Sequence, residues 1–210
     1  MNILFLGNSH TYHHGMAYQC EKIMQAQGVD VRVTMIAEAS KSLGWHRDFH
    51  ATRLALRYAD WDHIVLQQVT HPFPGKENLL EEARDLLAMM PEDQNAWLYQ
   101  TWCEKKIPSN QVILDEAFAA VSEALALPLV PVADAWCEAR RRDPHRELYD
   151  ADGEHAGRGG SYLAALCMAR CLSGRSVMGV PSTLMHGRRM LNRVSPEAAE
   201  AYQRVVEELI

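Results

Sequence analysis

The sequence predicts an α/β protein built on a parallel sheet of five strands. Short apolar runs alternate with longer amphipathic runs along the chain, the pattern of successive βα units. The short runs are almost continuously apolar, as expected for strands that helices cover on both faces. At 210 residues, with 48% hydrophobic and 23% charged residues, the chain is large enough for one core and too small to require two. We therefore expect a single domain over residues 1–210.

Each expected element is identified from its hydrophobic period. Five apolar runs are predicted strands: residues 2–7, 29–36, 63–67, 96–100 and 127–130. Stretches with apolar residues three and four positions apart are predicted helices: residues 12–27, 43–58, 76–89, 111–125, 163–172 and 196–210. Turn residues separate them, with Pro72, Pro74 and Gly75 after the third strand and with Pro91 and Glu92 before the fourth.

Charge and composition exclude several classes of partner. A net charge of −6 and a pI near 5.9 argue against nucleic acid, which requires a clustered cationic face. No apolar stretch reaches the length of a membrane span, and no signal peptide is recognisable at the start. The five cysteines are scattered and form no C-x-x-C pair, which suits reduced thiols. We expect a cytoplasmic protein with a small-molecule substrate; the oligomeric state is not indicated.

The first strand leads directly into the segment GNSHTYHHGM. Ser9 then lies at the carboxyl end of a strand, where open α/β sheets bind ligands. A serine there can attack an acyl carbon while its own N–H stabilises the oxyanion, although the same position also suits an ordinary helix-capping serine. Three histidines follow, His10, His13 and His14, and they raise a metal site as the alternative.

A second segment, LYDADGEHAGRGGSYLAA, contains Asp152 and His155 three residues apart before a helix. One short turn can then carry a general base and the carboxylate that orients it. Alone, this spacing also fits a surface loop in which the aspartate caps the turn. Asp150 lies close enough to compete for the same role, although we expect it to end the preceding segment or to cap the loop through its own backbone.

Taken together, four segments resemble the SGNH/GDSL hydrolase superfamily: GNSHT, DHIVLQQVTHP, YQTW and DGEHAGRGGSYLAA. They occur in the family's order through nearly the whole chain. The resemblance implies a flavodoxin-like α/β/α sandwich and ester hydrolysis without a cofactor. It also implies a catalytic triad in which Ser9 is the nucleophile, His155 the general base and Asp152 its orienting carboxylate.

The oxyanion hole departs from the family pattern. Where the family has a glycine that donates its N–H, this chain reads EASKSLGWH, so Ser40 or Lys41 must supply that donor beside the Ser9 N–H. Where many relatives have an asparagine, VLQQVTH offers Gln67 or Gln68, whose amides can replace it in kind. We expect Gln67 to be the donor.

The remaining histidines and aromatic residues leave two alternatives open. His46 and His50 are four apart and, with the first histidine cluster, suit zinc by type, but no carboxylate or cysteine completes a known zinc pattern, and we expect no metal. Tyr12 and Trp102 are the expected substrate-binding aromatics. The predicted function is a serine esterase that cleaves short acyl esters, such as O-acetyl groups on carbohydrate. The alternatives are a non-catalytic domain that binds a sugar or a protein partner, and a histidine-ligated metallohydrolase.

Overall fold

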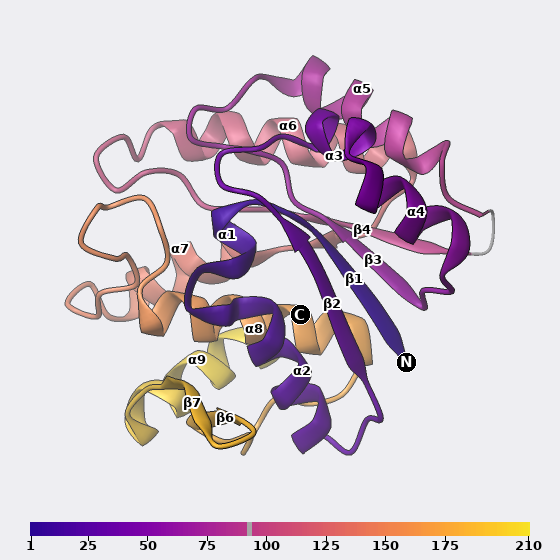
Figure 1. Ribbon diagram of the computed structural model, residues 1–210. Coiled ribbons are helices and arrows are strands. Elements are labelled where there is room, and N and C mark those ends of the chain that lie inside the picture. The colour runs from indigo at the N-terminus through magenta and orange to yellow at the C-terminus, as the bar shows by residue number, and fades with distance from the viewer. Residues whose placement is uncertain (92–93) are drawn as a thin grey trace.

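A computed structural model describes residues 1–91 and 94–210, and its centre is a parallel five-stranded sheet (Figure 1). The strand order β2-β1-β3-β4-β5 is the flavodoxin-like order of doubly wound sheets, so the predicted fold class is confirmed. The strands are β1 (Asn2–Gly7), β2 (Arg32–Ala37), β3 (His63–Leu66), β4 (Asn95–Tyr99) and β5 (Leu129–Val130). Glu92, part of an expected turn, falls outside the described residues.

Helices cover both faces of the sheet and make it a three-layer sandwich (Figure 1). One layer contains α3 (Leu43–Asp48), α4 (His50–Tyr58), α5 (Lys76–Leu87) and α6 (Asn110–Leu125). The other contains α2 (Met16–Ala26), α7 (Val132–Arg142), α8 (Arg158–Ser173) and α9 (Pro196–Leu209). Strand β1 shows why two cores form: Ile3 and Phe5 pack into one, Leu4 and Leu6 into the other, and all four are fully buried. Alternation of side chains along a strand produces this division.

The helix predicted over residues 12–27 is wrong in its first part. The chain forms a short helix α1 (Ser9–Tyr12), a 3₁₀ turn η1 (His13–Gly15) and then α2. His14 and Gly15 have φ angles of 50° and 68°, in the left-handed region that a continuous helix cannot contain. The helix predicted over 43–58 is also two helices, because the backbone of Phe49 is extended between α3 and α4.

Helix α7 and the antiparallel hairpin of β6 (Thr183–His186) and β7 (Arg189–Arg193) were not expected from the sequence. The hairpin packs beside α2 and η1. Its fully buried Asn192 donates hydrogen bonds to Gln19 Oε1 in α2 and to the carbonyl oxygen of Arg158 in α8, each at 2.9 Å. The hairpin therefore supports the segment that follows the first strand.

Helix α8 begins five residues before the predicted start, inside the glycine-rich stretch. A Cβ at Gly160 would lie 2.3 Å from the carbonyl oxygen of Leu148 and 2.4 Å from the ring of Trp136. Glycine is required there for close packing, which explains why a run that resembles a loop is helical.

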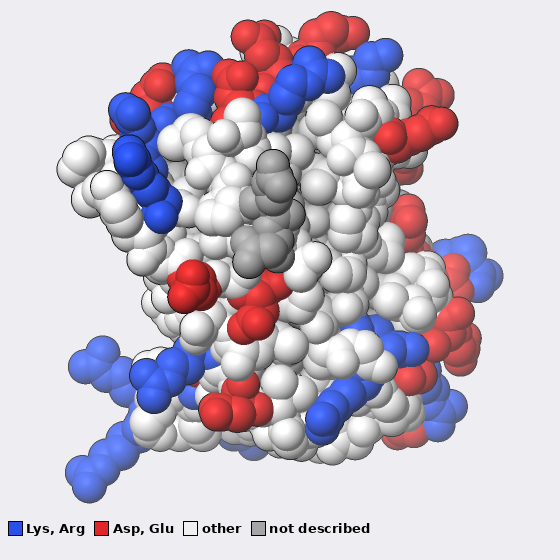
Figure 2. All heavy atoms as spheres, turned by 90° about the vertical axis from the view of Figure 1, so that its right-hand side faces the viewer, with Lys and Arg blue, Asp and Glu red and all other residues white. Residues whose placement is uncertain are grey.

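The carboxyl ends of the strands lie at one edge of the sheet, where α1 follows β1 (Figure 1). Figure 2 shows the opposite edge, on which acidic and basic side chains are interspersed over the upper, right-hand and lower parts of the view. Among the described residues, no helix has both the length and the apolar character to cross a membrane.

Candidate active site

Ser9 is the first residue of α1, immediately beyond the carboxyl end of β1. Asn8 caps this helix, because its side-chain oxygen accepts the His10 N–H at 3.1 Å. The Ser9 N–H is one of the first-turn donors for which a helix itself supplies no acceptor. Ser9 is partly exposed. Its hydroxyl and its N–H can therefore both serve a ligand at this edge of the sheet.

The loop before α8 brings two further side chains to Ser9. His155 Nε2 lies 2.8 Å from Ser9 Oγ, and His155 Nδ1 lies 2.6 Å from Asp152 Oδ2. The Asp152 carboxylate can only accept, so Nδ1 carries the proton and Nε2 presents its lone pair to the serine hydroxyl. The three residues expected to form a triad are thus joined in one hydrogen-bonded chain.

Asp152 is held in place by the backbone as well as by the imidazole. Its Oδ1 accepts the N–H groups of Glu154 at 2.8 Å and His155 at 2.9 Å. Partial burial alone would raise the pKa of Asp152, but these hydrogen bonds and the one from the His155 ring lower it well below its usual range. The carboxylate is therefore ionised at pH 7.

Asp150 has different partners. Its backbone N–H donates to the carbonyl oxygen of His155 at 2.8 Å, its carbonyl oxygen accepts the Gly153 N–H at 3.0 Å, and its Oδ1 accepts the Ala151 N–H at 2.8 Å. Asp150 thus caps the loop through its own backbone, as the sequence indicated. Its second carboxylate oxygen, Oδ2, faces His13 and His14.

Gln67 and Gln68 are fully buried, and both amides are engaged in the interior. Gln67 Oε1 accepts the Asn8 N–H at 2.7 Å and the Thr11 hydroxyl at 3.0 Å, while its amide nitrogen donates to the carbonyl oxygen of Gln68. Gln68 donates to Glu82 Oε2 at 2.7 Å and accepts the Leu43 N–H at 3.1 Å. Gln67 therefore fixes the backbone directly before Ser9 through its hydrogen bond from the Asn8 N–H.

The segment around Ser40 lies beside the turn that carries Asn8 and Ser9. Asn8 Nδ2 donates to the carbonyl oxygen of Lys41 at 3.1 Å, and Ser40 has a φ of 59°. The Lys41 N–H closes a turn onto the carbonyl oxygen of Glu38 at 3.2 Å. Two backbone N–H groups were expected as alternative oxyanion donors. That of Lys41 already donates to Glu38, whereas Ser40 holds the left-handed conformation that glycine adopts readily.

Behind Ser9 and His155 lie two histidines with fixed orientations: His10 is buried, and the side chain of His71 is only 5% exposed. His71 Nε2 lies 3.1 Å from the carbonyl oxygen of Trp102 and must donate to it, so His71 Nδ1 accepts from His10 Nε2 at 3.2 Å. Burial, followed by repulsion from His71, holds the pKa of His10 well below its ordinary value, and burial also lowers the pKa of His71. Both rings are therefore neutral at pH 7, so His155 has uncharged imidazoles on this side.

The His155 ring lies between two other imidazoles. His10 stacks against it with ring centroids 5.2 Å apart, and His13 stacks against it at 4.6 Å. The histidines of the alternative metal site are not all neighbours. His46 is fully buried and bonds to the carbonyl oxygen of Gly7 at 2.8 Å, while His50 is exposed at the start of α4.

The two expected substrate-binding aromatics differ in exposure. Tyr12 is partly exposed at the end of α1. Trp102 is fully buried, stacks on Trp136 with centroids 4.0 Å apart, and donates from Nε1 to the carbonyl oxygen of Glu154 at 2.9 Å. Its surface is thus covered, and it supports the loop that carries His155. A single tryptophan in a sequence does not reveal whether its neighbours cover it.

Comparison with known proteins identifies the fold. No family model and no curated protein match the chain. A DUF4886 family protein from Bacteroides uniformis is 18% identical, with a TM-score of 0.75, over 99% of this chain and 93% of that one. A member of the lipolytic protein G-D-S-L family from Veillonella parvula is 15% identical, with a TM-score of 0.59, over 80% and 94%.

A Clostridium thermocellum family 3 carbohydrate esterase has a TM-score of 0.65 at 9% identity, covering 83% of this chain and 98% of its own. The chain therefore has the fold of the GDSL hydrolases, as the four sequence segments implied.

Proposed function

We propose that the protein is a serine hydrolase of the SGNH/GDSL type that cleaves short acyl esters. The observation that carries this proposal is the continuous hydrogen-bonded chain from Asp152 through His155 to Ser9 Oγ, with contacts of 2.6 and 2.8 Å. Nucleophile, base and orienting carboxylate in this order define a triad by geometry.

In the proposed reaction, Ser9 Oγ attacks the acyl carbon and transfers its proton to His155 Nε2. The ionised Asp152 stabilises the imidazolium and keeps Nδ1 protonated. The carbon–oxygen bond of the ester breaks, the alcohol leaves with the proton from His155, and the acyl group remains on Ser9. Water then loses a proton to His155, attacks the acyl-enzyme and releases the acid while Ser9 regains its proton.

The proposed oxyanion donors are the backbone N–H groups of Ser9 and Ser40. The Ser9 N–H belongs to the first turn of α1, and the Asn8 side chain fixes the Ser40–Lys41 segment beside it through the 3.1 Å bond to Lys41. In this proposal, the buried amide of Gln67 positions Asn8 rather than contacting the oxyanion, because its polar atoms already bond to the interior. Preorganised donors of this type usually contribute about 3–4 kcal/mol each to transition-state stabilisation.

The proposed substrate is an O-acetyl ester, with a carbohydrate as the alcohol. The surroundings of Ser9 and His155 support a polar alcohol, since the rings of His10, His13 and His14 cluster there. The structural similarity to a family 3 carbohydrate esterase points the same way. Tyr12, partly exposed beside the nucleophile, is the proposed contact for the sugar ring.

Replacing the nucleophile tests the proposal. Ser9→Ala should lower kcat for 4-nitrophenyl acetate by several orders of magnitude, as deletion of triad members does, with little change in melting temperature. Dialysis of the parent protein against a strong chelator should leave its turnover intact, because the nucleophile is generated by His155 rather than by a metal-bound water. Loss of turnover that zinc restores would favour the metallohydrolase, and an inactive parent protein would favour the non-catalytic binding domain.

A series of acyl chain lengths tests the substrate class. Acetyl esters should have a higher kcat/KM than octanoyl esters, because the histidine-rich surroundings of Ser9 offer little apolar surface to a long chain. The measurement is kcat/KM for the 4-nitrophenyl acetate, butyrate and octanoate esters under one condition. A rise from acetate to octanoate would contradict the proposed specificity but not the triad.

A further inference from the structure

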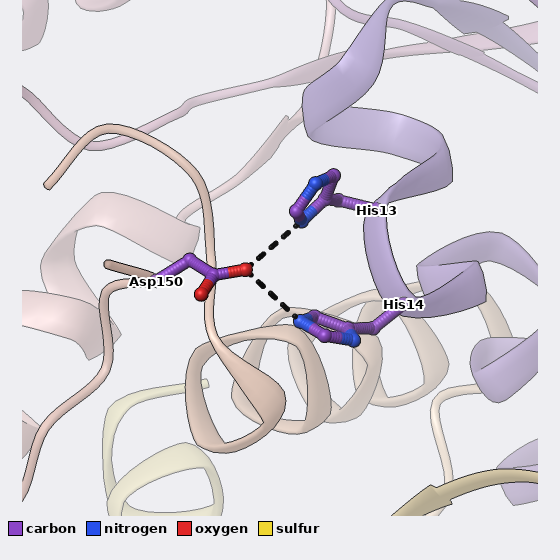
Figure 3. A group of neighbouring side chains, drawn as sticks. All are labelled: His13, His14 and Asp150. Atoms are coloured by element: carbon purple, nitrogen blue, oxygen red, sulfur yellow. Dashed lines mark ion pairs between the residues drawn. The ribbon is translucent and has the colours of Figure 1, made fainter. Parts of the chain in front are cut away.

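His13, His14 and Asp150 form a second cluster beside the triad (Figure 3). One ligand-type atom from each residue lies within 4.8 Å of the other two. The histidines come from η1, between α1 and α2, and the aspartate from the loop that also carries Asp152 and His155. Because these segments are far apart in the sequence, no local motif reveals the cluster.

The distances within the cluster exceed those of ordinary hydrogen bonds. Asp150 Oδ2 lies 3.5 Å from His14 Nε2 and 3.8 Å from His13 Nδ1, whereas N–H···O bonds are usually 2.7–3.2 Å. Zinc–nitrogen and zinc–oxygen bonds of about 2.0–2.2 Å place two tetrahedral ligands roughly 3.4 Å apart. Both distances from Asp150 Oδ2 are close to that spacing, and the Asp150 carboxylate faces both rings (Figure 3).

The backbone of His14 is fixed beside Asp150. His14 has a φ of 50°, an uncommon conformation for a non-glycine residue, and its carbonyl oxygen accepts a 3.0 Å hydrogen bond from Gln19 Nε2. The ring centroids of His13 and His14 are 5.1 Å apart, nearly perpendicular at 77°. Side-chain exposures of 31%, 25% and 39% for His13, His14 and Asp150 leave the cluster open to solvent.

We propose that His13, His14 and Asp150 bind one divalent transition-metal ion of the zinc class, with water completing the coordination. Two imidazoles and a carboxylate are a ligand set typical of such ions. On binding, His13 Nδ1 exchanges its long 3.4 Å contact with the carbonyl oxygen of Ala156 for the metal. The ion links the segment after Ser9 to the loop of Asp152 and His155. It takes no part in the proposed hydrolysis, and the proposal does not depend on that activity.

The test measures Zn²⁺ binding to the full chain without a histidine tag. Isothermal titration should give one equivalent for the parent protein, and Co²⁺ should give a visible absorption band from the same site. Asp150→Asn and His14→Asn should each weaken binding at least tenfold. Asparagine suits position 14 because it tolerates the left-handed conformation, and circular dichroism of each variant without metal checks its folding.

Two matched controls separate this cluster from other ligands. His145 is an exposed histidine outside the cluster, so His145→Asn should bind Zn²⁺ like the parent, as should Ser9→Ala. Zn²⁺ should also raise the melting temperature of the parent and of both controls, because binding stabilises only the folded state, and it should not raise that of the two cluster variants. The proposal is overturned if the parent shows no saturable binding, or if Asp150→Asn and His14→Asn bind as it does.

Discussion

Asp150 and Asp152 lie two residues apart near His155, yet the structure gives them different partners. Asp152 accepts the His155 ring at 2.6 Å, whereas Asp150 caps the loop and faces His13 and His14. Asp152→Asn should lower kcat on an acetyl ester by about 10²–10⁴, because an amide favours the wrong imidazole tautomer and does not stabilise the imidazolium. Asp150→Asn should cost less than about tenfold.

Melting temperatures of both variants control for damage to the loop. If kcat falls strongly in Asp150→Asn and stays near the parent value in Asp152→Asn, the assignment of the orienting carboxylate is wrong. If neither change lowers kcat, then His155 acts with Ser9 as a dyad or is not the base.

At the residue scale, the sequence indicated the members of the hydrogen-bonded chain but not the partners of the buried amides. Ser9, Asp152 and His155 could be selected because a strand end and a three-residue spacing are local signals. The side chain of Gln67, after β3, bonds to Asn8 and Thr11, which follow the neighbouring strand β1. No local sequence pattern encodes these long-range partners. The same reason conceals Asp150 as a partner of the two histidines.

At the element scale, the turn from β1 to α1 is packed so closely that it requires a glycine. A Cβ at Gly7 would lie 2.2 Å from Thr11 Oγ1 and 2.6 Å from Gln67 Oε1. Gly7→Ala should therefore destabilise the protein by about 1–3 kcal/mol, as overpacking does. It should also lower kcat, because the displaced atoms hold the backbone before Ser9. Urea unfolding and acetyl-ester kinetics measure the two effects.

Gly44→Ala in α3 is the matched control. The atoms that its Cβ would meet all belong to the Glu82 side chain, with Oε1 at 2.5 Å and Cδ at 2.9 Å. This flexible side chain can move aside at the cost of its hydrogen bonds from Ser42 and Gln68, and alanine favours a helix over glycine by about 1 kcal/mol. Gly44→Ala should cost less stability than Gly7→Ala and leave kcat near the parent value. Equal losses in both variants would contradict a special role for the β1–α1 turn.

The strands were predictable to within a few residues, since buried parallel strands are nearly continuous apolar runs. The interruptions of the helices were not. His14 carries no signal of its left-handed backbone, which depends on contacts such as that from Gln19. The hairpin of β6 and β7 was missed because most of its side chains are exposed and show little hydrophobic alternation; only Leu184 and Asn192 are buried in it.

At the scale of the whole molecule, buried neutral histidines couple folding to pH. Burial lowers the pKa values of His10, His46 and His71 below 6.5 in the folded state. Below about pH 6.5 the unfolded chain therefore binds more protons than the folded chain. The contribution of these three histidines to the free energy of unfolding is complete above that pH and is lost as the pH falls. Each histidine that stays neutral on folding costs up to about 1.4 kcal/mol per pH unit in this range.

The parent protein should therefore melt at a lower temperature at pH 5.5 than at pH 7.5, because on acidification the unfolded chain gains protons at these histidines that the folded chain does not. His46→Gln isolates one of them. Its amide can still donate to the carbonyl oxygen of Gly7, which His46 Nε2 contacts at 2.8 Å, but it does not titrate. The variant should melt below the parent at pH 7.5, and its melting temperature should fall less than that of the parent on acidification. A loss equal to that of the parent would mean that His46 becomes protonated without unfolding, and that acid destabilisation arises elsewhere in the molecule.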